Sequence, residues 1–70
     1  MISGKKIIER IEILHQQRIL RGISQTELAE KMGISKMELA KIENKELIPS
    51  ITVMEKYSEA LFLIAVSPKN

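Results

Sequence analysis

The chain has 70 residues, no cysteine, and 11 lysines and arginines against 9 acidic residues, which gives a formal net charge of +2. The lack of cysteine excludes a disulfide framework and thiolate metal sites, and the length fits a single domain over residues 1–70 whose small core a second subunit can extend. The longest apolar run, residues 61–66, is far shorter than the roughly 20 residues of a membrane-spanning helix, so we expect a soluble, cytoplasmic protein without a membrane partner.

Apolar residues at helical spacing predict a first helix over residues 4–20. Ile7, Ile11 and Leu14 form its apolar stripe, and Arg18 falls in the middle of that stripe. An unpaired buried charge is strongly destabilising. A carboxylate from elsewhere in the chain should therefore pair with Arg18.

Two shorter helices are predicted to follow closely. A serine precedes a glutamate by three positions in residues 24–27 and again in residues 35–38. Each pair fits a capping box, in which the serine oxygen accepts a hydrogen bond from a free amide of the first turn. Gly33 can adopt the left-handed conformation that ends the first of these helices. The spacing predicts helices over residues 25–32 and 36–44 joined by a tight turn, which is a helix-turn-helix.

These two short helices are expected to be amphipathic. Their inner faces carry Leu28, Ala29, Met32, Leu39 and Ile42, with Glu43 at the margin. The outer face of the second helix carries Met37, Ala40, Lys41 and Asn44. The surrounding lysines are Lys31, Lys36, Lys41 and Lys45. Together with a sequence pI of about 9.1, this grouping indicates a polyanionic partner.

A fourth helix is predicted after Pro49, with Ser50 as its N-cap. Its inner face carries Val53, Met54, Tyr57, Ala60 and Leu61. Its outer face carries Thr52, Glu55, Lys56 and Glu59.

The apolar run that follows breaks this pattern, because a continued helix would place Phe62, Leu63 and Val66 on or beside the charged side. We therefore predict a strand, or a segment buried on all sides, over about residues 61–67, ended by Pro68. Since an isolated strand is not stable, it is expected to pair with its copy in a two-fold homodimer, and a short fifth helix is the alternative. The expected dimer contacts are Phe62, Leu63, Ile64 and Val66.

Residues 18–61 resemble the helix-turn-helix domain of the Cro and phage-repressor family, also called XRE-like. The matching segments are SQTELAEKMGIS at 24–35, IEN at 42–44, Pro49-Ser50, and residues 57–61. The resemblance implies an all-α, compact, lambda-repressor-like bundle of four or five helices, in which the third helix enters the major groove of double-stranded DNA and a dimer reads two half-sites. It also implies an ion pair between Arg18 and Glu43, which supplies the carboxylate that the first helix requires.

The resemblance assigns DNA contacts to Gln25, Ser35, Lys36, Met37, Lys41, Asn44 and Lys45. Gln25 is implied to bind a phosphate and to brace the third helix, beside free amides that also attract phosphate. Lys36 and Met37 are implied to reach base edges, where a lysine can bond guanine and a methionine can pack on the thymine methyl group. Lys41 is implied to reach a base or a phosphate. Asn44 and Lys45 are implied to contact the DNA backbone.

Two features depart from the family pattern. Lys45 stands where glycine is usual, and a lysine in the left-handed conformation costs roughly 1 kcal/mol. Glu46 follows where a basic residue is frequent, and Glu38 adds a negative charge to the third helix. The two glutamates predict weak nonspecific affinity for DNA, so binding is expected to need a matched operator and to fall steeply with salt.

Two other functions are compatible with the sequence. Small antitoxins of this family bind DNA and also a toxin protein, and the predicted fourth helix running into a terminal strand is similar to several of them. A protein-interaction module without DNA binding is the second, supported by the acidic residues and by Ile13 and Leu20 on the outer side of the first helix.

An enzyme is not expected, because His15 is the only histidine and has no cysteine or aspartate to act with. No cofactor and no metal-ligand cluster is indicated.

Overall fold

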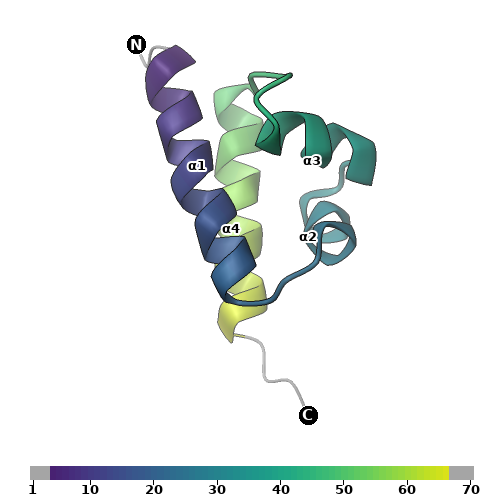
Figure 1. The fold of residues 1–70 in the computed structure, drawn as a ribbon. Coiled ribbons are helices and arrows are strands. Elements are labelled where there is room, and N and C mark those ends of the chain that lie inside the picture. The colour runs from purple at the N-terminus through teal and green to yellow at the C-terminus, as the bar shows by residue number, and fades with distance from the viewer. Residues whose placement is uncertain (1–3, 67–70) are drawn as a thin grey trace.

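The computed structural model describes residues 4–66, with side chains placed up to residue 64, and this part of the chain forms helices and no strand (Figure 1). The helices are α1 (Gly4–Leu20), α2 (Gln25–Met32), α3 (Lys36–Glu43) and α4 (Ile51–Val66). α1 and α4 lie side by side and run in the same direction (Figure 1). α2 packs against α4, and α3 packs against α2 and α1. The all-α architecture predicted from the sequence is confirmed.

Serine caps begin the three later helices. The Oγ atoms of Ser24, Ser35 and Ser50 each accept a hydrogen bond from the amide three residues further on, at 3.0, 3.0 and 3.2 Å. Such a cap contributes about 1 kcal/mol, because it satisfies an amide that the helix itself leaves without an acceptor. Gly33 ends α2 with a φ of 76°, and its amide bonds back to carbonyls of that helix. The capping serines and the glycine turn are therefore confirmed as predicted.

All four helices contribute to one apolar core. Leu28, Leu39 and Tyr57 are fully buried, one from each of α2, α3 and α4. The other buried apolar residues are Ile7, Ile11, Ile23, Ala29, Met32, Ile42, Met54, Ala60, Leu61 and Ile64. The inner faces expected from helical spacing are thus the faces that meet in the core.

α4 continues to Val66 as one helix, so the predicted strand over residues 61–67 is wrong for the described residues, and so is the alternative of a fifth helix. Tyr57, Leu61 and Ile64 follow the helical spacing of one buried face. Phe62 and Leu63 stay on the outside, with exposed fractions of 64% and 45%. The sequence reasoning took these outward apolar residues for the end of the helix. The side chain of Val66 and all of residue 67 lie outside the described part.

Ile64 supplies a test of the continued helix. Replacing it with alanine is expected to lower the free energy of unfolding by about 2–5 kcal/mol, because it leaves a cavity in the core. Phe62→Ala, two positions earlier, should change the free energy of unfolding of the monomer, measured at the lower protein concentration, by no more than about 0.5 kcal/mol, because the ring lies at the surface of the single chain. Urea unfolding followed by circular dichroism at two protein concentrations measures both effects and separates any contribution from association. Equal losses in the two variants would contradict the helix.

Candidate nucleic-acid interface

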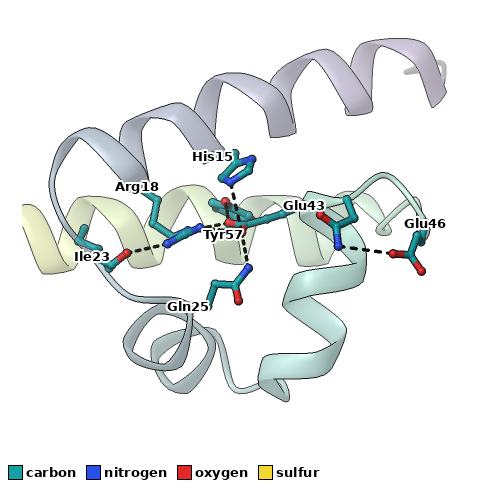
Figure 2. A network of polar contacts seen from close by, with 8 residues as sticks. His15, Arg18, Ile23, Gln25, Glu43, Glu46 and Tyr57 are labelled. Carbon is teal, nitrogen blue, oxygen red and sulfur yellow. Dashed lines mark hydrogen bonds and ion pairs between the residues drawn. The ribbon is translucent and has the colours of Figure 1, made fainter.

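The carboxylate of Glu43, the last residue of α3, forms a buried ion pair with Arg18 of α1 (Figure 2). Arg18 Nε donates to Oε2 at 2.8 Å and Nη2 donates to Oε1 at 2.9 Å. The remaining guanidinium nitrogen, Nη1, donates to the carbonyl of Ile23 at 2.8 Å. The two side chains are only 8% and 1% exposed. The pair that the sequence predicted is confirmed, in the bidentate geometry that makes arginine and carboxylate a strong combination.

Two more hydrogen bonds reach the same carboxylate (Figure 2). Gln25 Nε2, at the start of α2, donates to Oε1 at 2.9 Å, and the hydroxyl group of Tyr57 in α4 donates to Oε2. His15 Nε2 also lies 3.5 Å from Oε1, at the half-exposed edge of the cluster. We call Arg18, Gln25, Glu43 and Tyr57 the Glu43 network. It joins the carboxyl end of α3 to all three of the other helices.

Hydrogen bonding and charge determine the ionisation states within the Glu43 network. Burial alone would raise the pKa of Glu43, but the hydrogen bonds from Arg18, Gln25 and Tyr57 outweigh it and hold that pKa below its usual value. Burial raises the pKa of Tyr57, and its hydrogen bond to the carboxylate adds to the rise. For Arg18, burial would lower the pKa, but the bonds and charge of Glu43 prevail and raise it. A carboxylate, a guanidinium and a neutral phenol therefore persist together at neutral pH.

The sequence reasoning missed the roles of Tyr57 and His15 in this cluster. Tyr57 was correctly predicted on the inner face of α4. Because a buried tyrosine needs a hydrogen-bond partner for its hydroxyl group, the sequence already indicated that Tyr57 bonds a polar group in the core. By helical spacing, His15 lies at the edge of the apolar stripe of α1. Its approach to Glu43 follows from the packing of α1 on α3, which a single helical pattern does not reveal.

The opposite face of α3 points to solvent. Lys36, Met37 and Lys41 are exposed, and Met37 keeps 69% of its surface accessible. By helical spacing they share one side of α3, opposite the buried Leu39 and Ile42. The structure therefore brings these three predicted DNA contacts onto one outward surface. Ser35 lies at its edge, where its Oγ caps α3 by accepting from the Glu38 amide.

At the carboxyl end of α3, two predicted DNA contacts are bonded to acidic side chains. Asn44 Nδ2 donates to Glu46 Oε2 at 3.5 Å, and Lys45 Nζ donates to Glu12 Oε2 in α1 at 3.1 Å. Lys45 has a φ of 65°, so this lysine adopts the left-handed conformation for which a glycine is usual at this position. Both side chains are exposed.

The remaining surface of residues 4–66 contains no group of three or more histidine, cysteine or acidic residues placed to hold a metal ion. Within the same described residues, no helix combines the length and the apolar character that crossing a membrane requires.

Glu43→Gln tests the network. The variant is expected to lower the free energy of unfolding at pH 7 by about 3–5 kcal/mol, because it leaves Arg18 buried without its counter-charge. Glu46→Gln makes the same change of charge in the exposed loop and should cost less than about 0.5 kcal/mol. Denaturant unfolding measures both variants.

The lowered pKa of Glu43 also fixes the sign of its pH dependence. In the unfolded chain this carboxylate takes up a proton near pH 4.3, and in the folded chain it does so only at lower pH. Its stabilisation is therefore complete above the unfolded pKa and is lost as the pH falls through the folded pKa. The unfolding free energy of the wild-type chain should fall below about pH 4 more steeply than that of Glu43→Gln, and parallel profiles would show that Glu43 is not the group responsible.

A comparison with known proteins finds one family. The helix-turn-helix family model HTH_3 matches residues 14–64, a span that includes α2, α3, Arg18 and all the exposed residues of α3. No curated protein and no solved structure matches the chain. Since the matched span is most of the chain and coincides with the capped helix pair and its buried ion pair, the chain belongs to the helix-turn-helix family, whose members are DNA-binding regulators.

Proposed function

We propose that this chain is a sequence-specific transcriptional regulator that reads operator half-sites by placing α3 in the major groove of DNA. One observation carries the proposal: Lys36, Met37 and Lys41 share the outward face of a helix whose other face is anchored in the core. A helix held in this way presents the same side chains to every partner. The major groove is wide enough to admit such a helix.

The exposed side chains of α3 offer both kinds of contact that base reading uses. Lys36, in the first turn, can donate to O6 and N7 of guanine, and Met37 can pack on the methyl group of thymine. Lys41 lies farther along the same face and can donate to a base or to a phosphate. A mixed polar and apolar face of this kind favours base reading over purely electrostatic binding.

Gln25 offers a phosphate contact beside this face. Its amide nitrogen carries two protons, and one of them is used in the hydrogen bond to Glu43 Oε1. The second proton can be donated to a phosphate, while the free amides at the start of α2 add a partial positive charge. Gln25 would then link the DNA backbone to the residue that anchors α3.

The chain is also proposed to act as a homodimer, because helix-turn-helix proteins commonly read paired half-sites. Two large apolar side chains near the end of α4 support this, since Phe62 and Leu63 are 64% and 45% exposed. Ile64, which the sequence reasoning also assigned to the dimer contact, is 5% exposed and packs in the core of the same protomer. We therefore propose the outer side of α4 around Phe62 as the dimer contact.

Loss of individual lysines tests the reading face. After selection of binding sites from random DNA, Lys36→Gln is expected to weaken binding to the selected operator about 5- to 150-fold, since a base contact contributes about 1–3 kcal/mol. Binding to unrelated DNA should weaken much less. Lys56→Gln, on the exposed side of α4, removes the same charge and should change operator binding less than about twofold. Fluorescence anisotropy measures each affinity, and equal losses for Lys36→Gln and Lys56→Gln would contradict reading by α3.

Oligomeric state tests the dimer. Sedimentation equilibrium is expected to give a dimer for the wild-type chain and a monomer for Phe62→Glu, because a charge at a buried contact is not compensated. Lys56→Gln, which by helical spacing lies further round the same helix from Phe62, should remain dimeric. A monomeric wild-type chain at high concentration would exclude this part of the proposal.

A further inference from the structure

Lys45 forms an ion pair with Glu12 in the chain without DNA. Its ammonium group donates to Glu12 Oε2 at 3.1 Å, across the contact between the end of α3 and α1. We propose that Glu12 competes with DNA phosphate for Lys45 and thereby lowers the affinity of the chain for any duplex. This inference rests on the proposed function, and it gives a part in DNA binding to a residue of α1, outside the helix-turn-helix itself.

Lys45 stands in a turn whose backbone is fixed by hydrogen bonds. The residue is held in a left-handed turn, with a φ of 65°. Its amide donates to the carbonyl of Ile42 at 3.1 Å, and the next amide donates to the carbonyl of Lys41 at 2.8 Å. This turn is therefore fixed to the end of α3. Release of Lys45 from Glu12 needs only rotation of the flexible lysine stem and no movement of the backbone.

Glu12 and a phosphate offer the ammonium group equivalent partners. Both present anionic oxygens, and a lysine treats either as a point charge. The ammonium group can donate three hydrogen bonds, but a phosphate approaching Lys45 also meets the negative charge of Glu12. The neighbouring Asn44 is in a similar position, since its amide donates to Glu46. Two carboxylates therefore cover the end of α3 that is expected to face the DNA backbone.

The effect should be small and independent of base sequence. The side chains of Lys45 and Glu12 are 51% and 50% exposed, and water weakens an exposed ion pair. Removing the competitor should therefore raise the affinity for DNA about two- to fivefold. Because the contact involves the backbone of DNA, the same factor should apply to the operator and to a duplex of random sequence.

A double-mutant cycle on Glu12 and Lys45 tests the proposal. Fluorescence anisotropy with a labelled duplex of random sequence at low salt, about 50 mM, gives the affinities of the wild-type chain, Glu12→Gln, Lys45→Gln and the double variant. Glu12→Gln should bind about two- to fivefold more tightly than the wild-type chain. In the Lys45→Gln background, the same substitution should have almost no effect. Thermal unfolding of each variant checks that the fold is retained.

A matched control separates the competition from a general change of charge. Glu9→Gln removes one negative charge from another exposed position of α1 and should change binding less than about twofold. The inference is overturned if Glu12→Gln leaves the affinity unchanged, or if its gain persists when Lys45 is replaced. A wild-type chain that binds no duplex even at low salt would instead overturn the proposed function, and this inference with it.

Discussion

The bidentate pair between Arg18 and Glu43 is the interaction on which the arrangement of the helices depends. A buried ion pair is not stabilising by itself, because the cost of removing two charges from water can exceed their attraction. Here every polar group of the pair is satisfied. Arg18 also bonds the Ile23 carbonyl, and the carboxylate also accepts from Gln25 and Tyr57. Among the described residues, no buried side-chain nitrogen or oxygen lacks a hydrogen-bond partner.

The position of Glu43 gives this pair its structural effect. It is the last residue of α3, and its partners come from α1, α2 and α4. An apolar contact at this point would tolerate small rotations of α3, because dispersion forces have little directionality. Hydrogen bonds from fixed donors restrict the orientation of the carboxylate much more. The network therefore sets the direction of α3, while Leu39 and Ile42 supply the burial that holds it against the core.

Local patterns were enough to predict most of the fold. The bounds of α1 and α2 agree with the structure, and α3 ends one residue earlier than predicted because Asn44 is its C-cap. The serine caps and the turn at Gly33 depend on interactions within a few residues, so they can be recognised in a single sequence. The need of Arg18 for a carboxylate was also a local inference, although its identification with Glu43 came from the family resemblance.

What the sequence did not reveal depends on packing between helices. The end of α4 was misassigned because Phe62 and Leu63 were assumed to be buried, whereas an outward apolar residue is common on small proteins. The contact between Lys45 and Glu12 joins residues 33 positions apart, and no periodicity relates them. In the candidate site, helical spacing predicted the outward face of α3, whereas the acidic side chain of Glu12 at its carboxyl end comes from α1 and follows only from the way the helices pack.

The anchoring of α3 at its carboxyl end has an evolutionary consequence. The buried positions Leu39, Ile42 and Glu43 carry the structural demands on this helix, while Lys36, Met37 and Lys41 are exposed. Replacement of the latter three is therefore compatible with an unchanged scaffold. If α3 reads DNA as proposed, a lineage built on this domain can change its target sequence through a few outward positions, and a new recognition surface can be engineered there without redesign of the interior.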